Sequence, residues 1–158
     1  LKGVPAFYLP ALLASPNDLE TFRKTGQRRD LNREKFEADN LLELVKNFDS
    51  PASKNISYLT HIVKVRSRLK AFHPEASMKC ISTNIDNCVI IQRGLNEDSV
   101  FVICNMSNKC LRISPLNELK LLRLSSNNSL LDNITGSHLN TDSFKLNPYQ
   151  VVWLSLTD

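Results

Sequence analysis

The spacing of apolar residues changes near residue 76, and this change constrains the fold more than any other feature. Before it, apolar residues such as Ile56, Leu59, Ile62 and Val63 recur every three or four positions, as they do on the buried face of a helix. After it, short apolar segments alternate with turn residues, which is typical of strands. We therefore expect two domains, residues 1–74 and residues 75–158.

The second domain is predicted to be all-β. Its β-type segments are separated by turns rich in Asn, Ser, Gly and Asp, and no helix is expected among them. The expected strands cover residues 78–81, 89–92, 100–104, 111–113, 119–124 and 151–156. Short strands with short hairpins predict a small antiparallel β-sandwich or barrel.

The first domain opens with a near-continuous apolar run from Val4 to Leu9, typical of a parallel strand covered on both faces. A polar stretch over residues 15–32 follows, too long for an ordinary connection. Helices are expected over residues 37–47 and from Pro51 to Pro74. Strand, long loop and helix describe the last unit of a (β/α)₈ barrel, whose loops after the strands build active sites. We expect the strand to continue a domain that begins further upstream.

Charge and composition narrow the class of partners. The net charge is +4, and residues 1–73 hold 13 Lys and Arg against 8 Asp and Glu. Such an excess can attract an anion or can simply solvate helical faces. The sequence has no nucleic-acid-binding motif, so no nucleic-acid partner is expected. The apolar run before residue 15 is broken by Pro5 and Pro10 and is too short to span a membrane.

The four cysteines, Cys80, Cys88, Cys104 and Cys110, have neither a C-x-x-C pair nor histidines at zinc-finger spacing. We expect no metal and no cofactor. Without a secretory leader in the sequence, reduced and buried thiols in a cytoplasmic protein are the expectation.

Three stretches together resemble the end of enzymes of glycoside hydrolase family 13. Residues 3–8 (GVPAFY) look like the eighth barrel strand of that family. Residues 66–74 (RSRLKAFHP) resemble the end of its eighth helix, and residues 145–154 (KLNPYQVVWL) resemble the closing strand of its C-terminal β domain.

The loop narrows the resemblance to the sucrose phosphorylase-like group, which includes enzymes for sucrose, phosphorylated sucrose and glucosylglycerate. Residues 12–20 (LLASPNDLE) and 25–34 (TGQRRDLNRE) are similar to the motifs of that group, with Leu31 where isoleucine is usual. The resemblance extends over essentially the whole chain, is specific over residues 3–34 and is loose in the β domain.

The resemblance implies a retaining transfer of an α-glucosyl group to inorganic phosphate, the co-substrate, with small sugars as the other substrates. In the family all three catalytic acids come from earlier barrel strands, so we expect no catalytic residue within this chain. The missing N-terminal barrel portion is then the expected partner, and the chain alone is expected to be inactive.

Three loop residues are candidate substrate-binding residues. The resemblance puts Arg29 at the glucosyl subsite, where a guanidinium offers a fork of donors to oxygen atoms; the alternative is an exposed loop arginine. Asn17 and Asp18 are candidates for contact with the acceptor sugar, or they form an Asx turn after Pro16. Arg33 is expected to pair with a nearby carboxylate or carbonyl.

Several other polar and aromatic residues have structural interpretations. Asp30 and Asn32 are expected to bond to nearby backbone amides and so to organise the loop. Tyr8 is expected in a barrel core rather than under a sugar, and Trp153 is expected to pack in the β core.

Two other functions remain open from the residues. The β domain could be a noncatalytic module that binds carbohydrate or protein, which would need a row of exposed aromatic side chains. Its aromatics Phe101, Phe144, Tyr149 and Trp153 are scattered and expected to point inward. The chain could also be a fragment of an α-amylase-type hydrolase.

Overall fold

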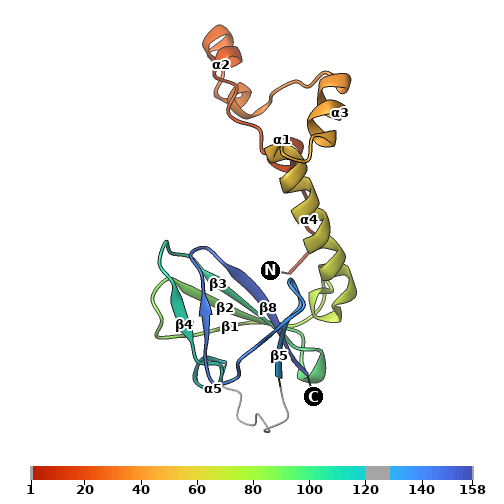
Figure 1. Cartoon of the computed structure of the whole chain (residues 1–158). Helices are drawn as coiled ribbons and strands as arrows, with labels where there is room; N and C mark the ends of the chain where they lie inside the picture. The colour runs from red at the N-terminus through yellow and green to blue at the C-terminus, as the bar shows by residue number, and fades with distance from the viewer. Residues whose placement is uncertain (1, 120–128, 158) are drawn as a thin grey trace. The chain divides into compact units, whose positions relative to one another are not determined.

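Alternating apolar residues after residue 76 build a six-stranded sheet in the computed structural model, in which every pairing is antiparallel (Figure 1). The strand order is β1-β2-β3-β8-β5-β6. The strands are β1 (Met78–Ile81), β2 (Cys88–Arg93), β3 (Val100–Asn105), β8 (Val151–Thr157), β5 (Ser129–Asp132) and β6 (Ser137–Leu139). A second sheet pairs β4 (Leu111–Ile113) with β7 (Phe144–Leu146).

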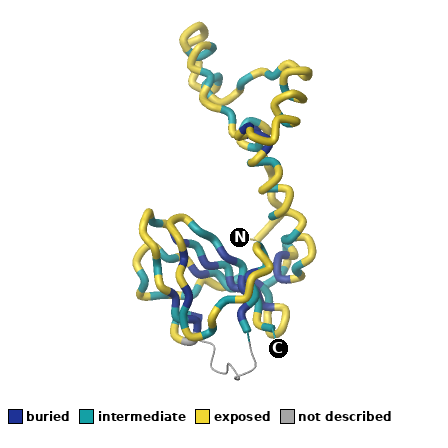
Figure 2. The backbone as a smooth tube through the Cα atoms, viewed as in Figure 1, coloured by how far each residue is buried: buried dark blue, intermediate teal, exposed yellow. Residues whose placement is uncertain are grey.

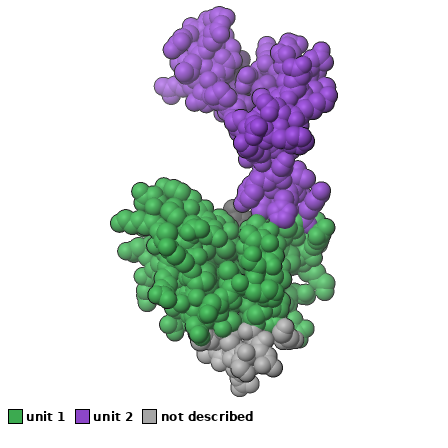
Figure 3. All heavy atoms as spheres, in the orientation of Figure 1, with its two compact units in different colours: residues 1–4, 65–158 green, residues 5–64 purple. Residues whose placement is uncertain are grey.

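The structure describes residues 2–119 and 129–157 and divides into two compact units (Figure 3). One unit consists of residues 1–4 and 65–158, and the other consists of residues 5–64. The division expected at residues 74 and 75 stays a prediction. No helix in the described part of the chain is both long enough and apolar enough to cross a membrane.

The main core lies between one face of the six-stranded sheet and the small β4–β7 sheet, where the buried segments of Figure 2 concentrate. Alternate residues of each strand point to this face, as the period of two requires. The core residues are Ile90, Phe101, Ile103, Ile113, Leu119, Leu130, Phe144, Leu146, Val152 and Leu154. Burial of this set supplies the main stabilisation of the unit.

A smaller core lies where the chain enters the sheet. Ala71 and Phe72, in the 3₁₀ turn η2 (Lys70–Phe72), pack with Val100. Trp153 adjoins this cluster with its ring centroid 4.5 Å from that of Phe72. The core-packing interpretation of Trp153 is therefore confirmed.

Most of the β prediction is confirmed, with three corrections. The strands β5, β6 and β7 were not predicted, and the helix α5 (Pro115–Glu118) interrupts a region where none was expected. Pro115 at the start of α5 favours a helical turn, which explains its place there. Of the strand expected over 119–124, Leu119 is the C-cap residue that follows α5. The rest of that strand and the turn at 125–128 lie outside the described residues.

The unit of residues 5–64 is helical. It contains α1 (Leu9–Leu12), α2 (Leu19–Thr25), η1 (Arg28–Asn32), α3 (Ala38–Lys46) and the start of α4 (Pro51–Arg68). The expected helix over 37–47 is confirmed as α3. The start of α4 is also as predicted, because the Ser50 hydroxyl accepts a hydrogen bond from the Ser53 amide at 3.0 Å.

The end of α4 differs from the prediction. The α-helix stops at Arg68, six residues before Pro74, and Leu69 has extended backbone angles of φ −96° and ψ 111°. The turn η2 then brings Ala71 and Phe72 into contact with the sheet. Burial of these two side chains is the physical reason for the early end.

The strand expected over Val4–Leu9 is not formed in this structure. Residues 4–8 form no strand, Val4 is 82% exposed and Phe7 is 49% exposed. The helix α1 begins at Leu9, one residue before Pro10. The hydrogen bonds of a parallel strand come from neighbouring strands, and residues 5–64 contain none.

Candidate functional site

The polar stretch after α1 is a folded loop built from α2 and η1. Asp18 caps α2, because its Oδ1 accepts a hydrogen bond of 2.9 Å from the Thr21 amide. Hydrogen bonding from the side chain of Thr21, and then from its amide, holds the pKa of Asp18 below its usual value. Gly26 ends α2 with φ +69°, the left-handed conformation that glycine adopts most easily. The sequence therefore sets both ends of this short helix locally.

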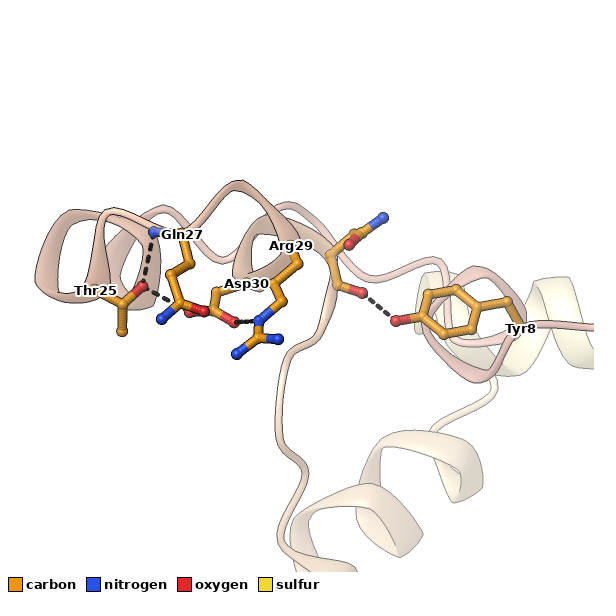
Figure 4. A network of polar contacts seen from close by, with 6 residues as sticks. Tyr8, Thr25, Gln27, Arg29 and Asp30 are labelled. Carbon is orange, nitrogen blue, oxygen red and sulfur yellow. Dashed lines mark hydrogen bonds and ion pairs between the residues drawn. The ribbon is translucent and has the colours of Figure 1, made fainter.

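Two hydrogen bonds join the beginning of the loop to its end. The Asp18 amide donates to the Leu31 carbonyl at 2.6 Å. The Tyr8 hydroxyl donates to the Asn32 carbonyl at 2.6 Å (Figure 4). Tyr8 is thus an anchor of the loop, a role that its aromatic character alone did not reveal. The expectation of Tyr8 in a barrel core is not met, because 49% of the residue is exposed.

Asp30 connects η1 to the end of α2. Its Oδ2 accepts a hydrogen bond of 2.6 Å from the Thr25 hydroxyl, whose oxygen in turn accepts one from the Gln27 amide at 3.2 Å (Figure 4). Its Oδ1 lies 3.9 Å from Arg29 Nε. Asp30 organises the loop as expected, although its carboxylate contacts the side chains of Thr25 and Arg29 instead of backbone amides. The Arg29 side chain is 65% exposed beside it.

These contacts leave a concave surface that we call the loop hollow, with a volume of about 530 Å³. Its lining residues are Asp18, Thr21, Thr25, Arg29, Asp30, Arg33 and Lys35. An adjoining cleft of about 240 Å³ is lined by Tyr8, Pro10, Ala11, Ala14, Ser15, Pro16, Asn17, Asn32 and Glu34.

The structure brings two of the three predicted site residues together. Arg29 and Asp18 line the loop hollow, and Asn17 lines the adjoining cleft. Sequence reasoning missed Lys35 and Thr21. The cations at positions 33 and 35, directly after the loop motif, are the signal that could have pointed to Lys35.

The remaining polar candidates have local partners. His73 Nδ1 accepts a hydrogen bond from the Glu75 amide at 3.2 Å, and His138 Nδ1 lies 2.9 Å from the Ser129 hydroxyl oxygen. Among the described residues, no group of three His, Cys, Asp or Glu side chains could hold a metal ion. Tyr149 is 68% exposed and does not point inward as expected.

All four cysteines are free. Cys80 and Cys110 are exposed, which corrects the expectation of buried thiols, because both lie at edges of the β unit where side chains meet solvent. Cys88 and Cys104 are partly buried, and burial raises the pKa of the Cys88 thiol to about 11. A thiol whose pKa is raised in this way stays protonated near neutral pH and is therefore a poor nucleophile.

Comparison with known proteins gives sequence relatives along the whole chain. The glucosylglycerate phosphorylase of Allomeiothermus silvanus is 30% identical over 155 residues, which are 98% of this chain and 24% of that protein. The glucosylglycerate phosphorylase of Escherichia coli is 24% identical over 155 residues, 96% of this chain and 25% of that protein. The sucrose phosphorylase of Bifidobacterium adolescentis is 38% identical over 72 residues, 46% of this chain and 13% of that protein. No protein-family model matches the chain.

Solved structures share the fold. An α-amylase from Anoxybacillus superposes with a TM-score of 0.54 at 15% identity, over 70% of this chain and 24% of that one. The trehalulose synthase of Pseudomonas mesoacidophila MX-45 superposes with a TM-score of 0.51 at 12% identity, over 73% of this chain and 19% of that one.

The solved structures that share the fold are enzymes of glycoside hydrolase family 13. By sequence, the chain matches the C-terminal part of glucosylglycerate and sucrose phosphorylases. It spans about a quarter of the length of the glucosylglycerate phosphorylases of Allomeiothermus silvanus and Escherichia coli. The resemblance that the loop motifs indicated is confirmed.

Proposed function

We propose that this chain is the C-terminal part of a retaining sugar phosphorylase that transfers an α-glucosyl group between a small sugar and inorganic phosphate. The observation that carries the proposal is the match of 98% of the chain to a glucosylglycerate phosphorylase. The match includes the loop whose residues Asp18 and Arg29 line one hollow.

The proposed chemistry needs two carboxylates on opposite sides of the scissile bond. In retaining enzymes these groups are about 5–5.5 Å apart, one as nucleophile and one as acid and then base. The nucleophilic carboxylate forms a bond to the anomeric carbon of the glucosyl group. The other half of the sugar substrate leaves with a proton from the acid carboxyl. Phosphate then attacks the anomeric carbon in place of water, which releases glucose 1-phosphate. We assign both carboxylates to the N-terminal portion of the longer protein, and expect the 158-residue chain alone to be inactive.

In this proposal the loop supplies substrate contacts. Arg29 donates hydrogen bonds to glucosyl hydroxyls or to the nucleophile, since its guanidinium is permanently charged and 65% exposed. Asn17 lies at the rim, where it contacts the acceptor. Asp18 uses one carboxylate oxygen for the helix cap and offers the other to the same acceptor.

The proposed partner of residues 5–64 is the remainder of the barrel. A hollow of about 520 Å³ within this unit has an almost entirely apolar lining, made by Phe7, Leu9, Leu12, Ile56, Leu59, Thr60, Val63 and Lys64. Contiguous exposed apolar surface of this kind is typical of a protein interface. Residues 4–9 would then pair as the last barrel strand, within a domain of residues 1–74 that precedes the β domain of residues 75–158. The four free cysteines fit the cytoplasmic location that belongs to the same proposal.

A chimera tests the proposed function. The C-terminal quarter of the Allomeiothermus silvanus glucosylglycerate phosphorylase is replaced by residues 1–158, and phosphate release from glucose 1-phosphate is measured with glycerate, glycerol and fructose as acceptors. We expect turnover by the chimera and none by the chain alone. A chimera that elutes as a folded protein but releases no phosphate with any acceptor contradicts the proposal, as does turnover by the chain alone.

Arg29 is tested in the same chimera. Arg29→Lys keeps the charge but removes the guanidinium fork, so we expect kcat/KM to fall at least about 100-fold, equivalent to about 2.7 kcal/mol. Arg28→Lys is the matched control and should change kcat/KM less than about threefold. Equal losses for the two variants would remove Arg29 from the substrate site.

A further inference from the structure

The loop hollow contains more positive charge than its own carboxylates neutralise. Its lining has three cations, Arg29, Arg33 and Lys35, and two carboxylates, Asp18 and Asp30. Within residues 2–119 and 129–157, no ion pair is formed by Arg33 or Lys35. The described residues show no hydrogen bond from the Arg33 side chain either, so the expectation that Arg33 pairs with a nearby carboxylate or carbonyl is not met.

Both carboxylates of the hollow are already engaged by the loop itself. Asp30 accepts a hydrogen bond from Thr25 through one oxygen and lies beside Arg29 through the other. Asp18 accepts a hydrogen bond from the Thr21 amide. These contacts set the turns of the loop, so neither carboxylate can move to Arg33 or Lys35 without loss of a loop contact.

Hydrogen bonds hold the backbone on either side of Arg33. Its amide donates to the Asp30 carbonyl at 3.3 Å, at the end of η1. The preceding carbonyl, that of Asn32, accepts the Tyr8 hydroxyl shown in Figure 4. Leu31, one residue earlier, accepts from the Asp18 amide at 2.6 Å. Arg33 therefore extends from a fixed stretch of backbone at the edge of the hollow, with Lys35 two residues further along.

We propose that Arg33 and Lys35 bind an oxyanion group of a small substrate, a phosphate or a carboxylate, in the loop hollow. A guanidinium matches the planar or tetrahedral arrangement of such oxygens with two parallel donors, and an ammonium adds a point charge. The inference rests on the proposed function and adds one property of its substrates: the substrate that occupies the loop hollow is anionic.

The test is a titration of the isotope-labelled 158-residue chain followed by amide chemical shifts. Inorganic phosphate, glycerate and fructose are added separately, so that a phosphate, a carboxylate and a neutral sugar are distinguished. We expect saturable shifts in residues 18–35 with phosphate or with glycerate, with a dissociation constant of roughly 1–10 mM. Fructose should leave these amides unchanged, and added NaCl should weaken the binding.

Two pairs of variants separate a specific site from general charge. Arg33→Gln with Lys35→Gln should weaken binding at least about tenfold. Lys46→Gln with Lys109→Gln lowers the net charge equally, from +4 to +2, at exposed positions outside the hollow, and should weaken binding less than about twofold. Arg33→Lys with Lys35→Arg keeps the charge and should retain part of the affinity. Circular dichroism verifies that each variant keeps the helical and strand content of the parent.

The outcomes that overturn the inference are specific. No saturable shift in residues 18–35 with either anion contradicts it, and so does an equal loss of affinity in the two Gln pairs. Its failure is distinguishable from failure of the proposed function. Turnover by the chimera without anion binding in the hollow removes only this inference, and anion binding without turnover removes only the proposed function.

Discussion

At the scale of single residues, Arg93 is the most unusual side chain of the β unit. It is only 1% exposed, its Nε donates to the Ala71 carbonyl at 3.1 Å and its Nη2 donates to the His73 carbonyl at 2.8 Å. Among the described residues no carboxylate forms an ion pair with it. Burial, together with the neighbouring Arg66, lowers the pKa of Arg93. The residue fastens η2 to strand β2, which is where the helical chain enters the sheet.

Arg93→Met should destabilise the β unit even though the methionine fills most of the space. It removes the Arg93 donor to the buried Ala71 carbonyl, and it leaves the His73 carbonyl with the Ala76 amide but without the guanidinium. We expect a loss of about 2–4 kcal/mol in the free energy of unfolding, measured by urea denaturation. Arg112→Met, at an exposed position in β4, is the matched control and should change stability by less than about 1 kcal/mol. A loss below that level for Arg93→Met would show that these hydrogen bonds do not hold η2.

Cys88 makes stability depend on pH in the alkaline range. Burial, with a smaller contribution from the negative charge of Glu118, raises its pKa from the ordinary value of 9.0 to about 11. Between these values the unfolded chain has lost a proton that the folded chain keeps, so folding becomes less favourable as the pH rises. Below pH 9 the thiol is neutral in both states and has no such effect.

The measurement compares the parent with Cys88→Ser in urea denaturation from pH 8 to pH 11. The stability advantage of the parent should shrink as the pH rises, because only the parent contains the Cys88 thiol, whereas the other three cysteines are common to both proteins. Cys80→Ser, at an exposed position, controls for the exchange of sulfur for oxygen. A difference between parent and Cys88→Ser that stays constant up to pH 11 would contradict the assignment.

At the scale of elements, the turn after β2 depends on Gly94. Its φ is +75°, and a Cβ at this position would lie 2.7 Å from the Asp98 carbonyl oxygen in η3 (Asn96–Asp98). Its amide donates to the Ser77 carbonyl at 3.0 Å, and its own carbonyl accepts from the Ser77 hydroxyl at 2.9 Å. The turn is thus closed on both sides of a residue without room for a side chain.

Gly94→Ala should therefore lower the free energy of unfolding by more than the strain of its backbone conformation alone would. Gly136 has a similar φ of +73° but has nothing within 4 Å of a built Cβ, so Gly136→Ala measures the conformational cost by itself. We expect about 1 kcal/mol for Gly136→Ala and at least about 2 kcal/mol for Gly94→Ala in thermal or urea unfolding. Equal losses would mean that η3 moves aside without cost.

Elements set by local signals could be predicted from the sequence, and elements set by distant partners could not. The Ser50 cap before Pro51 located the start of α4, and period-two alternation located β2 and β3. Strand β6 reads Ser137-His138-Leu139, with little apolar alternation, and it is defined by its pairing with β5. The run Val4–Leu9 has strong strand character, yet its hydrogen-bonding neighbours are not among these residues.

The residues of the candidate site also divide into those that a local motif predicts and those that distant contacts bring into place. The loop motif predicted Arg29 and Asp18, which line one hollow in the structure. Lys35 joins them only because Asp18, Tyr8 and η1 fix the path of the backbone after Asn32. Such a path depends on contacts between residues more than ten positions apart, which the local sequence pattern does not encode.

At the scale of the whole molecule, the two units differ in how much apolar surface they bury. The β unit has a closed core in which Ile103, Leu130 and Leu154 are fully buried. In residues 5–64 only Leu13 and Ala52 are buried apolar residues, while Phe7 and Leu9 remain about half exposed. Exposed apolar surface of this kind is typical of a protein interface, which the proposed barrel portion would cover.

Hydrogen exchange at the amides of residues 4–9 tests the central claim most directly, in the isolated chain and in the chimera with the phosphorylase barrel. A strand within a barrel has its amides bonded to neighbours, whereas residues 4–8 of this structure form no strand. We predict exchange within seconds in the isolated chain and protection of at least about 100-fold in the chimera. Unprotected amides over residues 4–9 in a folded chimera would contradict the account.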